Sequence, residues 1–196
     1  MLKRLFDIIA SLIGIILLLP FFIVICLAMI VSCGFPLFYL QTRVGKNGKD
    51  FKLFKFRTMH LDADKKGLLT VGGRDPRVTS IGFYLRKYKL DELPQLFNVL
   101  FGTMSLVGPR PEVRKYVDLY TKEQQQVLSV KPGITDFASL EYINENDLLA
   151  KSDNPEKTYI DEIMPAKLDL NAKYIQQQGL LVDFKIILKT IFKIVQ

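Results

Sequence analysis

The sequence lacks several residue types, and each absence excludes a class of protein. Tryptophan is missing from the 196 residues, histidine occurs once, at His60, and there are two cysteines. One histidine excludes mechanisms that need two, and the small Cys and His content excludes a metal cluster built from them. Two cysteines cannot form the disulfide framework of a small secreted domain. The chemistry of this chain therefore depends on carboxylates, basic residues and apolar surface.

Several sequence motifs of common enzymes are also missing. The chain has no Walker motif, no dinucleotide-binding glycine fingerprint, no nucleophile elbow and no zinc-ligand pattern. Its 49% hydrophobic and 24% charged residues exclude a disordered chain. Its length suits one domain, or one domain with an anchor.

The positive charge is concentrated near the N-terminus. The net charge is +7, and residues 1–60 carry eight Lys and Arg against two Asp, whereas the other 136 residues carry 19 basic against 18 acidic residues. The basic residues flank a long apolar segment, which indicates contact with anionic lipid or with a phosphate-bearing substrate. They form no separate basic arm, so we expect no nucleic acid partner.

The apolar segment is long enough to enter a membrane. No charged residue occurs between Ile8 and Leu40, and Leu12–Val31 is a run of 20 residues, which is the length that spans a bilayer as a helix. A cleaved signal peptide is one interpretation, because Cys33 follows the run as in a lipoprotein. The run is, however, about twice as long as a signal peptide requires.

Two other interpretations keep the segment in the mature protein. One is an ordinary transmembrane helix, and the other is a re-entrant hairpin that enters and leaves by the same face. Basic residues stand on both sides of the run, which places both ends in the cytoplasm. Pro20 lies inside the run and predicts a kink. Residues alone leave the transmembrane and hairpin alternatives balanced.

The rest of the chain reads as short elements separated by turns. Phe51–Met59 is predicted as a strand or extended segment, residues 62–77 as a loop, and 79–90 as a helix. A further helix is expected from Asp91, as N-cap, to a stop at Gly102. Leu181–Val195 is an amphipathic helix with lysines on its polar face, which fits docking to a core or lying in a membrane interface.

Asp91 and Glu92, followed at short range by Arg110, stand out as candidate chemical groups. Adjacent acids at the start of a helix are often no more than a complement to its dipole. In the functional interpretation they are a carboxylate nucleophile and a site for Mg²⁺. Arg86 and Arg110 are then the candidates that grip phosphate oxygens.

A series of ordered motifs resembles one family, the bacterial sugar transferases, also called monotopic phosphoglycosyl transferases, in their minimal form. The matching segments run along nearly the whole chain: Lys3-Arg4 with Asp7, the mid-segment Pro20, 41–45 (QTRVG), 55–59 (KFRTM), 75–79 (DPRVT), 90–96 (LDELPQL), 104–111 (MSLVGPRP), 131–135 (KPGIT) and 181–187 (LVDFKII).

The resemblance implies a specific activity and architecture. Such enzymes move a sugar-1-phosphate from a UDP-sugar to a polyprenyl phosphate, such as undecaprenyl phosphate, and release UMP. They work at the cytoplasmic face of the bacterial inner membrane, in its phospholipid, at the first membrane step of glycoconjugate assembly. The implied fold is mainly α with little β (α+β). A re-entrant helix-break-helix anchor is expected over residues 1–40. A cytoplasmic catalytic domain with interfacial helices is expected over 41–196.

The resemblance also implies roles for particular residues. Asp91 is the expected nucleophile, carrying a covalent phospho-sugar in a ping-pong reaction, and Glu92 is its acidic partner. Both are the expected ligands of Mg²⁺, the implied cofactor. Pro20 is the expected membrane kink. The expected phosphate and substrate contacts are Arg86, Arg110, Lys55, Arg57 and Asp169.

Some features depart from the family pattern, and some questions stay open. The segment 136–145 carries acids where relatives have an arginine, and Thr103 stands where an Asp is usual. These changes bear on substrate choice, so the sugar and the pathway are not predicted. A homodimer is one oligomeric state compatible with the sequence. A non-catalytic membrane-tethered binding protein is the alternative function.

Overall fold

The computed structural model describes residues 2–63, 67, 69–72 and 75–195. Part of the expected loop 62–77 thus lies outside the described residues. Within the described part, the chain is mainly helical with two small two-stranded sheets, as expected. The helices and strands are α1 (Leu2–Cys33), β1 (Phe38–Val44), β2 (Asp50–Phe56), α2 (Ser80–Lys87), α3 (Gln95–Phe101), β3 (Ser105–Val107), α4 (Arg114–Val117), β4 (Gly133–Thr135), α5 (Phe137–Glu141), α6 (Glu145–Ala150), α7 (Pro155–Thr158), α8 (Met164–Gln177) and α9 (Leu180–Val195).

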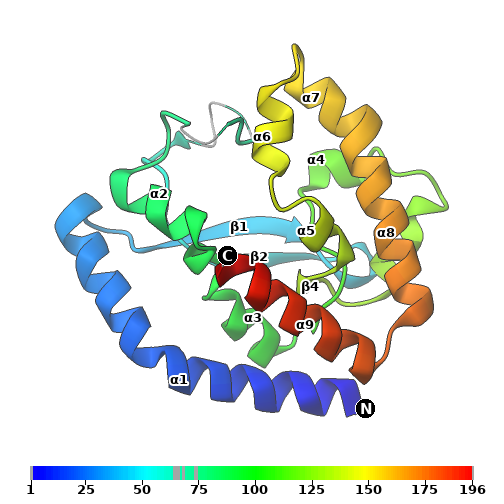
Figure 1. Ribbon diagram of the computed structural model, residues 1–196, viewed down its shortest axis with the longest axis horizontal. Helices are drawn as coiled ribbons and strands as arrows, with labels where there is room; N and C mark the ends of the chain where they lie inside the picture. The colour runs from blue at the N-terminus through cyan, green and yellow to red at the C-terminus, as the bar shows by residue number, and fades with distance from the viewer. Residues whose placement is uncertain (1, 64–66, 68, 73–74, 196) are drawn as a thin grey trace.

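The long helix α1 runs along one side of the molecule and bends in its middle, where Figure 1 shows it curving around the other elements. Pro20 lies inside it and removes one backbone donor, which accounts for a bend. By length and composition, it is the one helix among the described residues that could cross a membrane. It is one continuous helix, and no membrane is part of the structure, so its topology stays a prediction.

Both ends of α1 are attached to the remainder of the fold. Near its start, Arg4 donates hydrogen bonds to the carbonyls of Val99 (2.6 Å) and Leu100 (2.8 Å) at the end of α3. Toward its other end, Phe22 packs on Phe56 of β2 with ring centroids 5.5 Å apart. Because residues of α1 form part of the hydrophobic core, the structure does not favour a cleaved signal peptide.

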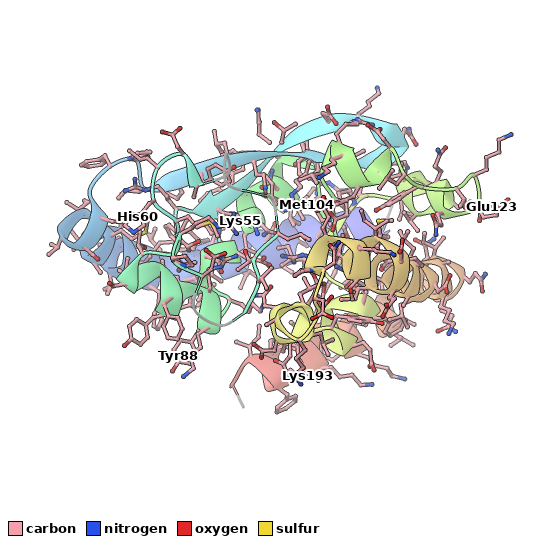
Figure 2. The ribbon with its side chains drawn as sticks, turned by 90° about the horizontal axis from the view of Figure 1, so that it is seen from above. Lys55, His60, Tyr88, Met104, Glu123 and Lys193 are labelled. Carbon is pink, nitrogen blue, oxygen red and sulfur yellow. The ribbon has the colours of Figure 1, made fainter. Side chains whose placement is uncertain are left out.

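The antiparallel pair β1–β2 crosses the centre of the molecule, with Gln41 opposite Leu53 in its register. The expected strand near Phe51–Met59 is confirmed as β2, which ends at Phe56. The second sheet is the short parallel pair β3–β4. Figure 2 shows Lys55 of β2 and Met104 among the packed elements, whereas Glu123 and Lys193 lie at the periphery.

The C-terminal helix α9 confirms the helix predicted there and packs through one narrow face. Asp183 and Ile186 are each 1% exposed, whereas Leu181 is 80% and Phe184 is 53% exposed. Lys3 of α1 donates hydrogen bonds to the Asp183 carboxylate and to Tyr174 of α8, so the start of α1 is joined to α8 and to the first turn of α9. One face of α9 thus docks on the core, and its exposed apolar face suits the expected membrane interface.

Candidate active site

A cavity of about 1070 Å³ lies between α1, β2, α9 and the segment α5–α6. Its lining changes character from one part to another. The charged part is lined by Arg43, Lys55, Arg86, Asp91, Glu92 and Arg110. The apolar part is lined by Phe6, Ala10, Gly14 and Leu18 of α1 and by Phe184, Ile187 and Ile191 of α9. One cavity can therefore receive an anionic group and an apolar chain together.

The two adjacent acids lie in a single 3-10 turn, Leu90–Glu92, between α2 and α3. The expectation that Asp91 is the N-cap of a helix is wrong, because α3 begins at Gln95 with Pro94 as its N-cap. Lys89 adopts a left-handed conformation (φ 55°) that separates this turn from α2. The expected stop at Gly102 is confirmed. Because Asp91 caps no helix, its carboxylate is left for chemistry.

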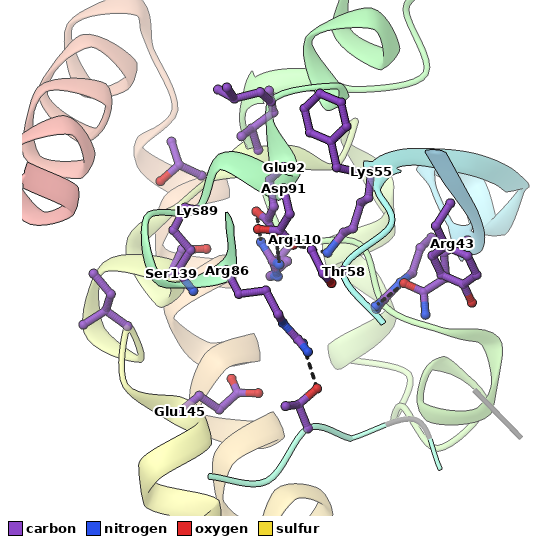
Figure 3. A pocket seen from close by; sticks show the side chains of 18 of the residues that line it. Arg43, Lys55, Thr58, Arg86, Lys89, Asp91, Glu92, Arg110, Ser139 and Glu145 are labelled. Atoms are coloured by element: carbon purple, nitrogen blue, oxygen red, sulfur yellow. Dashed lines mark hydrogen bonds and ion pairs between the residues drawn. The ribbon is translucent and has the colours of Figure 1, made fainter. Parts of the chain in front are cut away.

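Glu92 is held by two cations, as Figure 3 shows for Arg110. Arg110 Nη1 donates to Glu92 Oε2 at 3.1 Å and Nη2 donates to Oε1, while Lys55 Nζ donates to Oε1 at 3.1 Å. Burial alone would raise the pKa of Glu92, but the charges of Arg110 and Lys55 hold this pKa well below its usual range. Glu92 is therefore ionised at neutral pH and fixes both cations in the cavity wall.

Asp91 has the opposite environment. Its residue is 7% exposed, and among the described residues none donates a hydrogen bond to its carboxylate. Burial raises the pKa of Asp91, the positive charge of Lys55 opposes this, and the negative charge of Glu92 adds to it. Two neighbouring carboxylates are thus held differently, one as an anchored anion and one as a poorly solvated, reactive group.

Arg110 is positioned by a close crossing of two backbone segments. Gly108 and Gly133 lie so near that a Cβ on Gly133 would stand 2.1 Å from the nitrogen of Gly108. Only glycine fits there, and Gly133 N donates to the Pro109 carbonyl at 3.0 Å. The Arg110 amide also donates to buried Asp136 at 3.1 Å. These contacts fix the backbone from which the guanidinium reaches Glu92.

Arg86 reaches the cavity from the last turn of α2. Its Nη2 donates to Thr70 Oγ1 at 2.8 Å, and its Nη1 is buried without a partner in the described structure. A buried guanidinium nitrogen without an acceptor is costly, so this donor is open to an anionic ligand. Figure 3 shows Arg86 extending across the cavity below Asp91.

Two other predicted residues have different positions. Arg57 lines the cavity, but its Nη2 donates to the carbonyls of Cys33 (2.6 Å) and Gly34 (2.8 Å), so it attaches the end of α1. Asp169 lies on α8 with an exposed side chain and is not part of the cavity lining. The cavity brings together Lys55, Arg57, Arg86, Asp91, Glu92 and Arg110.

Sequence reasoning missed a polar network beside the site. Arg43 Nη1 lies 3.4 Å from Glu112 Oε2, and the Tyr159 hydroxyl donates to Glu112 Oε1 at 2.6 Å. Burial would raise the pKa of Glu112, but the charge of Arg43 is the main influence that holds this pKa below its usual range. These residues are far apart in sequence, and none carries a motif that predicts the contact.

The carboxylates of the cavity suit Mg²⁺ unequally. The described residues contain no group of three or more His, Cys, Asp and Glu arranged to hold a metal. Mg²⁺ often takes only one or two protein carboxylates and completes its shell with water and substrate phosphates. Asp91 fits that mode, because its carboxylate takes no hydrogen bond from the part of the chain that the structure describes. Glu92 has both oxygens engaged by cations.

Comparison with known proteins identifies the family of the chain. The description of the family model that matches residues 1–196 is "Bacterial sugar transferase". A putative undecaprenyl-phosphate N-acetylgalactosaminyl 1-phosphate transferase of Bacillus subtilis is 46% identical over 62% of this chain and 68% of its own length. The UDP-glucose:undecaprenyl-phosphate glucose-1-phosphate transferase of Klebsiella pneumoniae is 38% identical over 97% of this chain.

Relatives differ in length. The chain spans 39% of the Klebsiella protein, but 87% of the sugar transferase EpsL of Bacillus subtilis, which is described as uncharacterized and is 37% identical over 98% of this chain. The family match covers residues 1–196. The chain therefore belongs to the bacterial sugar transferase family.

Proposed function

We propose that this protein transfers a sugar-1-phosphate from a UDP-sugar to a polyprenyl phosphate such as undecaprenyl phosphate, and so serves polysaccharide assembly. The observation that carries the proposal is the buried carboxylate of Asp91, which takes no hydrogen bond among the described residues and shares a cavity with Lys55, Arg86 and Arg110. Membership of the family and the printed activities of relatives support this substrate class.

In the first step, an Asp91 oxygen attacks the phosphorus that bears the sugar. The bond between that phosphorus and the bridging oxygen of the diphosphate breaks, and UMP leaves with the bonding electron pair. The result is a phospho-sugar bound to Asp91. Arg86 has a free buried donor to bind a phosphate oxygen, and Arg110 is held in place by Glu92.

In the second step, a phosphate oxygen of the lipid acceptor attacks the same phosphorus. The bond to Asp91 breaks, its carboxylate is regenerated, and the product is a polyprenyl-diphospho-sugar. The apolar part of the cavity, between α1 and α9, gives an isoprenoid chain a route to this centre. Because UMP leaves before the lipid enters, one set of cations can serve both substrates.

Mg²⁺ is part of this proposal. Asp91 would hold it together with the phosphates of the substrate, and the ion would offset the negative charge of the diphosphate. Glu92 contributes mainly by holding Arg110 and Lys55, since contact with a metal would require it to release one of these cations.

The attachment of α1 supports a monotopic, re-entrant placement at the cytoplasmic face of the inner membrane. A helix of 32 residues is about 48 Å long, which exceeds the hydrocarbon thickness. Yet Arg4 near one end and Cys33 at the other both contact the same domain. A membrane crossing would put these ends on opposite sides. Green fluorescent protein fused at either end should therefore fluoresce in the cytoplasm, and a dark N-terminal fusion would refute this placement.

The test of the activity is UMP release by the full chain in lipid nanodiscs. UDP-glucose, UDP-galactose and UDP-N-acetylgalactosamine would each be supplied with undecaprenyl phosphate and Mg²⁺. We expect release with at least one donor, and its loss in Asp91→Asn. Asp161→Asn is the matched control, since that residue is exposed and does not line the cavity.

Each outcome decides between the alternatives. A burst of UMP without acceptor, equal to the enzyme concentration, supports the covalent intermediate. Equal release by wild type and Asp91→Asn rules out Asp91 as the nucleophile. No release with these or other UDP-sugars, with donor binding retained in both proteins, favours the non-catalytic binding protein.

A further inference from the structure

The wall of the cavity formed by α5 and α6 has a chemistry unlike that of the cationic part. It presents Ser139, Tyr142, Glu145 and Asn146, none of which is positively charged. Figure 3 shows Glu145 across the cavity from Asp91 and Glu92, with Arg86 reaching between them. A carboxylate on this wall has no role in the steps derived above, although it faces the space that a substrate occupies.

We propose that Glu145 recognises a vicinal diol of the nucleotide-sugar donor by accepting hydrogen bonds from its hydroxyl groups. This inference rests on the proposed function and assigns a specificity-determining residue within it. The diol belongs either to the ribose of the nucleotide or to the transferred sugar, and both sources present the same pair of donors.

The Glu145 carboxylate is fixed from behind, as a recognition group requires. Its Oε2 accepts a hydrogen bond from Lys167 Nζ at 2.7 Å, and Lys167 is 8% exposed with its ammonium 5.3 Å from the ring centroid of Tyr159. Among the described residues, no donor is bound to Oε1. One oxygen thus anchors the side chain and the other is open to a ligand.

The charges of the cavity decide which part of the donor meets Glu145. The diphosphate is drawn to Arg86 and Arg110, while a carboxylate repels it. The negative charge of Glu145 also contributes to raising the pKa of Arg110, so the two groups lie within electrostatic reach. An uncharged part of the donor attached to the diphosphate therefore faces Glu145.

Hydroxyl pairs are the groups on that part that suit a carboxylate. Asp and Glu accept only, and the open oxygen of Glu145 has two lone-pair sites, which can take the donors of two adjacent hydroxyl groups. Dinucleotide-binding domains bind ribose in this way through an acidic residue. The uracil ring carries no such pair, so the contact is to ribose or to the sugar.

The experiment measures binding by calorimetry with the full chain in nanodiscs, in the Asp91→Asn background so that no turnover occurs. The protein with Glu145 intact is compared with the variant Glu145→Ala. The control variant is Asp147→Ala, since Asp147 is an exposed acid on the same helix and lies outside the cavity. The probes are UDP, 2′-deoxy-UDP, UDP-glucose and UDP-N-acetylgalactosamine.

A ribose contact predicts that Glu145→Ala weakens UDP by roughly 10–100-fold, because a hydrogen bond to a charged group has about this magnitude. The same variant should weaken 2′-deoxy-UDP by clearly less, because that probe keeps only the 3′-hydroxyl of the diol. A sugar contact predicts unchanged UDP and a similar loss for a UDP-sugar. In both cases Asp147→Ala should leave the affinity for every probe unchanged.

Other results overturn the inference. Equal weakening of all four probes shows that Glu145 acts only through the structure of its ion pair with Lys167. If Glu145→Ala weakens the binding of none of the probes, contact between Glu145 and the donor is excluded. Failure of every probe to bind when Glu145 is intact removes the proposed function itself, whereas binding without discrimination leaves that function standing and removes only the diol contact.

Discussion

Asp91 and Glu92 are neighbours in sequence, yet the structure predicts that neutralising them changes stability in opposite directions. Glu92 holds Arg110 and Lys55, and Glu92→Gln would leave both largely buried cations without the carboxylate that pairs with them. Breaking a buried pair in this way costs about 3–5 kcal/mol. Since the Arg110 side chain is 32% exposed, we take the lower end, about 3 kcal/mol.

Asp91 has no hydrogen bond among the described residues to compensate for burial of its charge. Its raised pKa means that the folded state favours the protonated form, so its contribution to stability is present at low pH and is lost as pH rises through the folded pKa. At neutral pH the ionised group is a net cost. Asp91→Asn should therefore stabilise the fold, by about 1 kcal/mol.

The contribution of Glu92 to stability depends on pH in the reverse way. Its pKa is held well below 4.5, so its contribution to stability is present above that value and is lost as pH falls through the folded pKa. At neutral pH, Glu92→Gln removes the whole contribution.

The assay is thermal unfolding in detergent followed by circular dichroism, since the chain has no tryptophan to report by fluorescence. With a shift of about 2–4 °C per kcal/mol for a chain of this size, Glu92→Gln should lower Tm by roughly 6–12 °C and Asp91→Asn should raise it by about 2–4 °C. Exposed Asp161→Asn serves as the control and should leave Tm unchanged. If both site variants lower Tm by similar amounts, the assignment of different environments to the two carboxylates is refuted.

Four further outcomes follow from the same structure. Donor turnover should fall as pH drops through the raised pKa of Asp91, because only the ionised carboxylate attacks phosphorus; a rate that stays level down to the usual range near 3.8 would contradict this. Gly133→Ala should destabilise the fold by about 3 kcal/mol and abolish activity, while Gly179→Ala, whose added Cβ would meet nothing nearer than 4.0 Å, should be tolerated. Asp183→Asn leaves Lys3 without its carboxylate and should cost about 2–3 kcal/mol, seen as faster trypsin cleavage at the lysines of α9; unchanged cleavage would show that α9 docks by apolar contact alone. EDTA should stop UMP release without lowering the Tm of the donor-free protein, because the ion is expected to arrive with substrate phosphates, and a large drop in Tm would instead indicate a resident metal.

Local signals in the sequence predicted part of the fold well. The apolar run indicated a membrane-associating helix, Gly102 indicated the end of α3, and periodicity indicated α9. Each of these rests on residues near one another in the chain. The predicted start of α3 at Asp91 was wrong, because Leu90–Glu92 forms a separate 3-10 turn and the helix begins at Gln95. The left-handed Lys89 before that turn is a conformation that residue type alone does not predict for lysine.

The candidate site was only partly predictable, for a different reason. Arg86, Asp91 and Arg110 lie within 25 residues, so a motif could indicate them together. The contact of Lys55 with Glu92 and that of Glu112 with Tyr159 each join distant segments. Such contacts depend on how β2 and the π-helical turn Tyr159–Ile163 pack, and packing has no local signature.

The joining of α1 to α9 has a consequence for how the protein is made. Lys3 leaves the ribosome before its partner Asp183, which is 180 positions later, so at 5–20 residues per second the ammonium waits about 10–40 s for its carboxylate. During that interval α1 can enter the lipid while the cavity still lacks the wall formed by Phe184, Ile187 and Ile191. A chain interrupted before α9 would hold Asp91 and its cations but no closed path for the lipid. The apolar wall that α9 adds to the cavity is thus the last part of the site to be made, after the acidic pair and the arginines.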